Sequence, residues 1–99
     1  MRIGFKSKKL EKLYTQEKGA RKYPPPVVDA FFELVSTIQA ADSLLDLYAL
    51  ESLHFEQLGG DRKGDRSFIL HDRWRLEVVL EKDRQGYMVT ILKISKHYE

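Results

Sequence analysis

Two arginines give the first indication of chemistry in this 99-residue sequence. Arg62 lies in a basic stretch with glycines at both ends, residues 59–64, and Arg75 lies in the alternating apolar and charged segment at residues 74–81. A guanidinium group binds two phosphate oxygens through parallel hydrogen bonds. We therefore expect the two arginines to bind a ligand that carries phosphate. The alternative is an ordinary surface ion pair, for example between Arg75 and Glu77.

The charged residues are segregated along the chain. Residues 1–22 carry eight Lys or Arg and two acids, residues 23–57 carry six acids and no Lys or Arg, and residues 58–99 carry nine basic and seven acidic residues. The net charge is only +2, so the distribution is more informative than the sum. It indicates a basic surface for a polyanion and an acidic flank that faces elsewhere.

The composition predicts one globular domain over residues 1–99, because 42% of the residues are hydrophobic and 32% are charged. The chain has no cysteine and no apolar run near the ~18 residues that span a bilayer. We therefore expect a cytoplasmic protein that does not associate with membranes. The three histidines have no recognised ligand spacing, and the common nucleotide-binding and hydrolase motifs are absent, so neither a metal nor another cofactor is expected.

The hydrophobic pattern predicts an α+β fold in which two N-terminal helices pack on a small twisted antiparallel sheet that a short N-terminal strand joins. The expected strands are residues 2–5, 53–57, 67–71, 74–81 and 87–94, and the expected helices are residues 8–17, 25–41 and a short turn at 44–48. Gly19 is expected to end the first helix, and the proline-rich connection at residues 18–26 should not be helical in its middle. A tight turn is expected at residues 72–73 and a longer one at residues 82–86.

An apolar stripe at helical spacing marks the second helix. Its members are Val28, Phe31, Phe32, Val35 and Ile38. Aromatic side chains in such a stripe usually pack in the core, so we do not expect Phe31 or Phe32 to stack on nucleic-acid bases.

Two segments of the sequence resemble one known family. LGGDRKG at residues 58–64, followed by DRWRLEVVL at residues 72–80, resembles the HigB-type toxins of the RelE/ParE superfamily, also called plasmid-maintenance killer proteins. The shared motif positions are Leu58, Gly60, Asp61, Arg62 and Gly64, then Trp74, Arg75 and Leu76, and finally His97. The order of the other segments agrees, so the resemblance covers nearly the whole chain. It implies a RelE-like fold, a cognate antitoxin of the HigA-like helix-turn-helix kind, and metal-independent cleavage of mRNA on the ribosome.

Departures from the family pattern fall on catalytic positions. Glu56 stands two residues before the motif leucine, where many relatives have histidine, and Gly59 stands where they have lysine. The family's terminal Asp-Tyr-His is here Ser-Lys-His, at residues 95–97.

The implied reaction assigns roles to four residues. Cleavage through the 2′-OH needs a base, an acid for the leaving 5′ oxygen and positive charge around the phosphorus. Arg62 and Arg75 would supply the charge. His97 would transfer a proton near neutral pH, and Glu56 would accept the 2′ proton.

Further RNA contacts are expected from side chains that carry positive charge or an aromatic ring. These residues are Lys63, Arg73 and Lys96 for the mRNA, Tyr98 for stacking on a base, and Lys8, Lys9 and Lys12 for ribosomal RNA phosphates. The three helix lysines have a simpler alternative role as the solvated side of a helix. Two other functions also remain open, namely a toxin of the same fold that inhibits DNA gyrase without cleaving RNA, as the ParE branch does, and a degenerate member that only binds its antitoxin.

Overall fold

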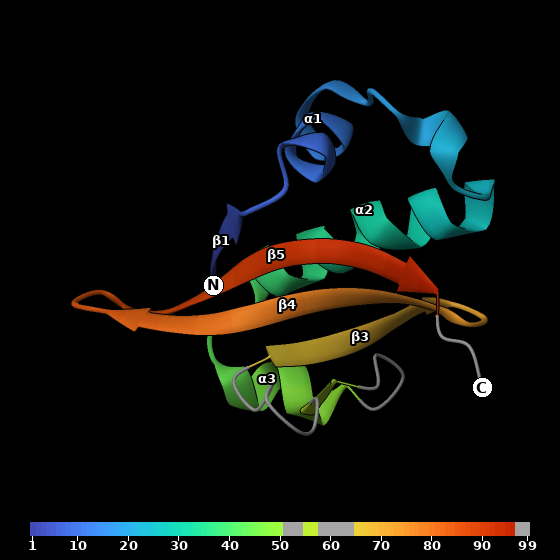
Figure 1. Ribbon diagram of the computed structural model, residues 1–99. Helices are drawn as coiled ribbons and strands as arrows, with labels where there is room; N and C mark the ends of the chain where they lie inside the picture. The colour runs from blue at the N-terminus through green and yellow to red at the C-terminus, as the bar shows by residue number, and fades with distance from the viewer. Residues whose placement is uncertain (51–54, 58–64, 97–99) are drawn as a thin grey trace.

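One sheet of five strands forms the centre of the fold, with helices packed on one of its faces (Figure 1). A computed structural model describes residues 1–50, 55–57 and 65–96 of the chain. The strands are β1 Arg2–Phe5, β2 Glu56–Gln57, β3 Asp65–His71, β4 Trp74–Asp83 and β5 Gly86–Lys96. The helices are α1 Lys8–Gln16, the 3₁₀ turn η1 Ala20–Lys22, α2 Pro25–Ala40 and α3 Leu44–Ala49. The expected α+β class is confirmed.

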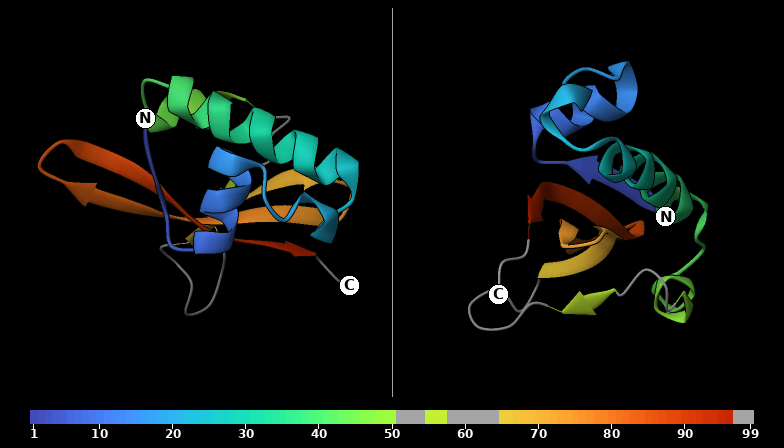
Figure 2. Two further views of the ribbon diagram at one scale, coloured as in Figure 1. Left: turned by 90° about the horizontal axis from the view of Figure 1, so that it is seen from above. Right: turned by 90° about the vertical axis from the view of Figure 1, so that its right-hand side faces the viewer.

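The strands lie in the order β1-β5-β4-β3-β2. Strands β2 to β5 pair as an antiparallel meander, as the alternating pattern and the short connections predict. β1 adds to the far edge in parallel with β5, with Ile3 opposite Val89. Parallel neighbours need a long connection, and here the helices and three strands intervene between them. Figure 2 shows α2 running along one face of the sheet with α1 next to it.

The first helix begins as predicted but ends earlier. The Ser7 side chain caps it by accepting a hydrogen bond from the Leu10 amide. Glu17, at φ 56°, takes the left-handed conformation that ends the helix, so the expectation that Gly19 ends it was wrong. Gly19 instead precedes η1, which contradicts the prediction of a connection without helical structure. The turn is complete before the three prolines, so their ring geometry does not prevent it.

α2 is the predicted long helix, with its buried stripe shifted toward Val27 and Leu34. Both are buried at α-helical spacing from Phe31, whereas Val28 and Phe32 are only partly buried. Phe32 lies at the edge of the stripe because it stacks on Tyr14 of α1, with ring centroids 5.8 Å apart. The expectation of a packing role for both phenylalanines agrees with this placement.

The core lies between the helices and the facing side of the central strands. Its buried members include Leu10, Leu13, Phe31, Leu34, Val35, Ile38, Leu47, Phe55, Phe68, Leu76, Val78, Val89 and Ile91. Phe55, just before β2, stacks on Phe68 of β3 at 4.5 Å between ring centroids. Leu76 and Val78 therefore face the helices, and the alternate residues of β4 face the other side of the sheet.

Two connections set the strand register. Asp72, at φ 53°, lies in the tight turn predicted at residues 72–73. The longer turn predicted at residues 82–86 is wrong, because Asp83 pairs with Gly86 and leaves only two turn residues. Gly86 takes φ 107°, a conformation that a side chain would strain. The register of β5 also shifts near Leu92, since Glu77 pairs with Lys93 and Val78 with Ile91.

Candidate active site

The sheet face opposite the helices, here called the open face, carries a polar row across four strands. Glu56 of β2, Ser67 of β3, Glu77 of β4 and Lys93 of β5 are successive register partners. Side chains of directly paired residues lie on the same face. The row is therefore positioned by the same pairing that directs Phe68 and Leu76 into the core.

Glu77 is the buried acid of this row. It retains only 6% of its exposure, and its Oε2 lies 3.9 Å from Nζ of Lys93. A buried carboxylate is stabilised only where positive charge or hydrogen bonds compensate for lost hydration. Among the described residues, Glu77 forms its ion pair with Lys93. The alternative considered above, an ion pair between Glu77 and Arg75, is not present there.

Arg75 lies one step along the open face from Glu77. Its register partners are Ile69 on β3 and Ser95 on β5, and it is partly buried. Within the described parts of the chain, its guanidinium forms neither a hydrogen bond nor an ion pair. Its donors are thus available to an external anion such as a phosphodiester.

Two buried hydroxyls lie on the same face. Ser67 and Thr90 are 1% and 4% exposed, and neither hydroxyl has a hydrogen-bond partner among the described residues. Thr90 pairs with Val79 and with Gly4 of β1, where a Cβ on Gly4 would lie 3.4 Å from the threonine oxygen. The sequence alone indicated no role for Ser67 or Thr90, and it indicated Glu77 only as a surface partner of Arg75. Strand alternation nevertheless places Ser67 and Glu77 on this face.

Several predicted site residues fall outside the described part of the chain. These are Arg62, Lys63, His97 and Tyr98. For Glu56 the register position is described and the side chain is not. Ser95, the register partner of Arg75, lies two residues before His97.

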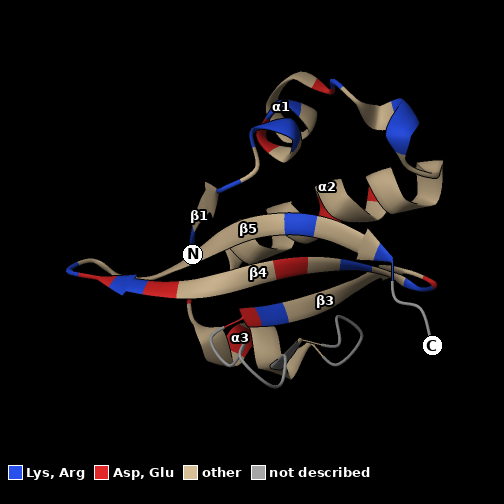
Figure 3. Ribbon diagram, in the orientation of Figure 1, with Lys and Arg blue, Asp and Glu red and all other residues tan. Residues whose placement is uncertain are grey.

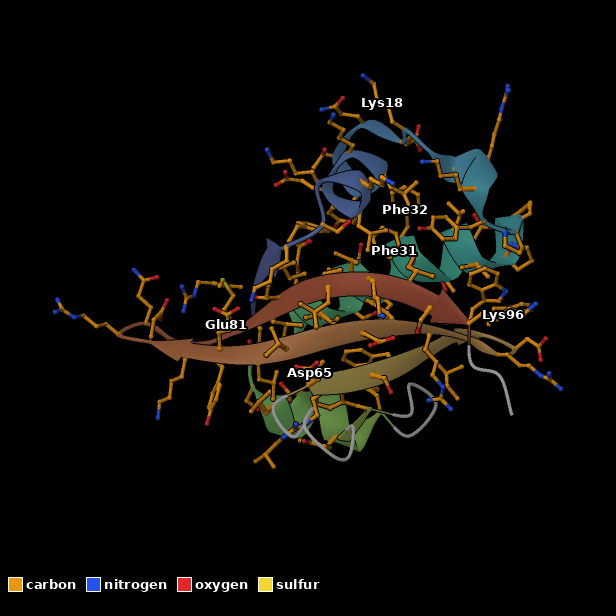
Figure 4. The ribbon with its side chains drawn as sticks, viewed as in Figure 1. Lys18, Phe31, Phe32, Asp65, Glu81 and Lys96 are labelled. Carbon is orange, nitrogen blue, oxygen red and sulfur yellow. The ribbon has the colours of Figure 1, made fainter. Side chains whose placement is uncertain are left out.

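Lys96 lies on the opposite side of the sheet from Arg75. It pairs with Trp74, and its ammonium lies 5.8 Å from the centre of the indole ring, which Tyr23 contacts edge-on. Because Ser95 is the partner of Arg75, its neighbour Lys96 faces the helices. Figure 4 shows Lys96 at the end of β5. Arg73 is exposed in the turn before β4.

The predicted helix lysines belong to a separate basic surface. Lys8, Lys9 and Lys12 are all exposed on α1. Lys9 and Lys12 also line a hollow of about 200 Å³ together with Lys18 and Lys22, which the sequence analysis did not assign. The buried side chains of Leu10 and Leu13 form part of its wall. We call this feature the lysine hollow. Figure 3 shows the basic residues of α1 and η1 beside the acidic positions of α2, and Figure 4 labels Lys18.

The described residues contain neither a candidate metal site nor a candidate membrane span. No group of three or more His, Asp or Glu side chains in residues 1–50, 55–57 and 65–96 could hold a metal ion. Over the same ranges, no helix has the length and apolar character needed to cross a bilayer.

Comparison of the whole fold gives matches to solved toxin structures. A YoeB/ParE toxin from Agrobacterium tumefaciens superimposes with a TM-score of 0.59 at 15% identity, covering 99% of this chain and all of that one. A YoeB dimer from Staphylococcus aureus gives a TM-score of 0.56 at 18% identity, covering 99% and 98%. At this level of identity, the likeness concerns the fold.

Comparison of the sequence identifies the family. Residues 3–91 match the model of HigB-like toxins, described as the RelE-like toxin of the type II toxin-antitoxin system HigB. Toxin HigB-1 of Vibrio cholerae is 33% identical over 76 residues, which cover 77% of this chain and 80% of that protein. The chain therefore belongs to the HigB-like family of RelE-like toxins, which function with an antitoxin partner.

Proposed function

We propose that this toxin is a ribosome-dependent endoribonuclease that cleaves mRNA and so inhibits translation. The 2′-oxygen attacks the adjacent phosphorus and gives its proton to a base. The bond from phosphorus to the 5′-oxygen breaks, and an acid protonates that oxygen. The products are a 2′,3′-cyclic phosphate and a 5′-hydroxyl. Negative charge builds up on the phosphoryl oxygens during attack, so fixed positive charge there accelerates the reaction.

The observation that carries this proposal is the Arg75 guanidinium on the open face. It is held by a central strand, partly buried and without a partner among the described residues. Partial burial strengthens its interaction with an anion because less water screens the charge. A rigid strand also limits the reorganisation needed when the phosphate arrives.

The strand register supports placing the remaining catalytic groups near Arg75. Ser95, its partner, leads directly toward His97, to which we assign proton transfer. Arg62 is three residues from Asp65, a distance of at most about 11 Å of chain. Val79, the partner of Asp65, lies four residues from Arg75, about 13 Å along the strand. Binding of one phosphodiester by both guanidinium groups therefore requires the chain before Asp65 to bring Arg62 back toward Arg75.

Glu56 is our candidate for accepting the 2′ proton. It begins the polar row, two strands away from Arg75 and two residues along, which corresponds to about 12 Å between Cα atoms. Ser67 lies between Glu56 and Glu77 in that row. Its hydroxyl is buried, so we assign it no contact with the RNA.

The ribosome supplies the second half of the proposed site. A base and an acid supplied by Glu56 and His97 make a weak catalytic set, and positioning of the mRNA by the ribosome can compensate by several kcal/mol. We assign the lysine hollow and Lys8 to ribosomal RNA phosphates, and Lys63, Arg73, Lys96 and Tyr98 to contacts with the mRNA. The cytoplasm is the compartment that this reaction requires, and a HigA-like helix-turn-helix protein is the antitoxin we expect.

Cleavage of a defined mRNA on programmed ribosomes tests the proposal. Arg75→Ala should lower the single-turnover rate about 10²- to 10³-fold, the usual effect of losing one donor to a developing oxyanion. Arg75→Lys should give an intermediate rate, because it keeps the charge and loses the paired hydrogen bonds. Arg84→Ala, an exposed arginine in the β4–β5 turn, is the matched control and should cleave at the full rate.

Primer extension on cellular mRNA extends the test to growing cells. Wild-type toxin should produce new 5′ ends within coding regions, and Arg75→Ala and His97→Ala should abolish them. A toxic wild-type protein that leaves mRNA intact but produces DNA breaks and an SOS response would identify a gyrase inhibitor instead. Full toxicity of both variants would show that the open face is not the site.

A further inference from the structure

A large groove lies at the end of the molecule away from Arg75. Its volume is about 570 Å³, and it lies between the start of β1, the α2–α3 connection with the first turn of α3, and the β4–β5 hairpin. Leu44, Leu45 and Tyr87 contribute much of its apolar wall. We call this feature the α3 groove.

Four large hydrophobic side chains are exposed in the described residues, and two of them line this groove. They are Leu45, Tyr48, Leu50 and Tyr87. Leu45 is the extreme case, at 78% exposed, and both Leu45 and Tyr87 line the groove itself. An exposed leucine does not contribute the stabilisation that its burial would give. Neighbouring exposed apolar side chains often mark a surface that binds another molecule.

The charges around the groove define the chemistry of the occupant. Asp42 lines it. Asp46, in the first turn of α3, does not line the groove and accepts a hydrogen bond from the Asp42 amide. Both positive groups in the wall are engaged. Arg2 binds Asp83 through a hydrogen bond of 2.8 Å between Nη1 and Oδ2, and the Met1 ammonium donates to main-chain carbonyls at residues 38, 39 and 41. The lining is therefore largely apolar with one acidic side chain, Asp42, and a complementary segment presents apolar side chains flanked by Lys or Arg.

We propose that the α3 groove is the docking site of the cognate antitoxin, which inserts an apolar segment with basic flanks. Membership of a type II toxin family requires a protein partner that binds this chain. The groove combines the volume, the exposed apolar contacts and the charge that such a partner needs. This assignment depends on the family and is independent of the ribonuclease reaction.

The position of the groove determines how the antitoxin neutralises the toxin. Arg75 and Asp83 are eight residues apart on β4, about 26 Å in an extended strand. In Figure 4, Lys96 lies at the end of the sheet opposite the β4–β5 hairpin. A partner held in the α3 groove leaves Arg75 uncovered. With the ribosome-dependent function proposed above, on which this step rests, it blocks entry into the ribosome by its bulk.

Titration calorimetry of purified toxin with the antitoxin encoded beside it tests the proposal. Leu45→Ala and Tyr87→Ala should each raise the dissociation constant at least about tenfold, as truncation of a central interface side chain does. Leu50→Ala is the matched control, because Leu50 is also exposed at the end of α3 and does not line the groove. Its affinity should equal that of the wild type. Asp42→Asn should weaken binding more at low than at high salt.

Growth assays give the corresponding result in cells. Leu45→Ala toxin should remain toxic alone and should no longer be rescued by the antitoxin, whereas Leu50→Ala toxin should be rescued fully. Unchanged affinity of Leu45→Ala and Tyr87→Ala, or an equal loss in Leu50→Ala, overturns the assignment. Sedimentation of the toxin alone tests whether a second copy of this chain occupies the groove. A toxin dimer that Leu45→Ala dissociates would identify that second copy as the occupant, and would also overturn the assignment to the antitoxin.

Discussion

At the scale of single residues, the alternation of side chains along a strand decides which charged groups lie on the same face of the sheet. Arg75 and Ser95 lie on the open face, while their neighbours Trp74 and Lys96 lie on the helix side. In the proposed complex, an RNA on the open face would therefore reach Lys96 only around the end of β5. A side chain adjacent in sequence to a catalytic residue need not share its site, because one step along a strand reverses the face.

The buried hydroxyl of Thr90 leads to a prediction about stability. A hydroxyl removed from water without a partner destabilises the folded state by about 1–3 kcal/mol. Thr90→Val preserves the shape and removes this penalty, so the free energy of unfolding in urea should rise by about 1 kcal/mol. Thr37→Val is the control, because Thr37 donates a hydrogen bond of 2.9 Å to the Glu33 carbonyl and should gain nothing. A loss of stability in Thr90→Val would mean that its hydroxyl is bonded in solution.

At the scale of elements, β1 is held to the sheet partly by one ion pair. Arg2 binds Asp83 at the end of β4, eighty-one positions away in sequence. The Arg2 guanidinium, helped by a hydrogen bond from the Gln85 amide, holds the pKa of the Asp83 carboxyl below its usual value. The same contact raises the pKa of Arg2. The ionised carboxylate thus contributes stability at neutral pH that is lost as the pH falls through its lowered pKa.

Asp83→Asn should therefore destabilise the protein in a pH-dependent manner. The difference in the free energy of unfolding from the wild type should be present at pH 7. It should shrink below about pH 4, where the unfolded carboxyl begins to protonate, and vanish below the lowered pKa of the folded state. Asp29→Asn, which removes an exposed carboxylate from α2, should show no such trend. A difference that stays constant from pH 7 to pH 2 would exclude the ion pair as its cause.

The sequence predicts the elements well and their ends less well. Alternation located β3, β4 and β5 to within two residues at each end. It did not reveal the two-residue turn before Gly86, because Lys82 and Asp83 are polar and look like loop residues although they extend a hairpin beyond the core. The register shift near Leu92 was equally hidden, since it depends on the partner strand.

The sequence predicted which kinds of residue form the candidate site, but it identified only some of the residues that lie there. Arg75 could be found because a strand pattern and a family motif both include it. Ser67 and Thr90 could not be identified as buried, because register and the close approach of Gly4 determine their surroundings. Lys18 and Lys22 join Lys9 and Lys12 only after η1 folds back beside α1.

At the scale of the whole molecule, positive charge lies on two separate surfaces. Arg75 occupies the open face of the sheet, whereas the lysine hollow lies in the helical layer between α1 and η1. No ion pair within the described residues neutralises the four ammonium groups of the hollow. Four like charges around one concavity concentrate positive potential there. A single extended mRNA strand can bind to one of these surfaces. RNA that surrounds the toxin on several sides can bind to both the open face and the lysine hollow.

The lysine hollow should therefore govern the salt dependence of ribosome binding. Each lysine that contacts a phosphate releases counterions and contributes about 0.9 to the slope of log affinity against log salt. Lys18→Gln together with Lys22→Gln should lower that slope by about 2 for binding to vacant 70S ribosomes. The affinity is measured between about 50 and 200 mM salt, the range over which counterion release changes it strongly. Cleavage of mRNA at saturating ribosome should remain at the wild-type rate, because neither lysine contacts the open face. Lys6→Gln together with Arg84→Gln removes the same charge from exposed positions outside the hollow, and should leave the slope nearly unchanged. Equal slopes for the two double variants would show that binding responds to net charge and that the hollow has no specific role.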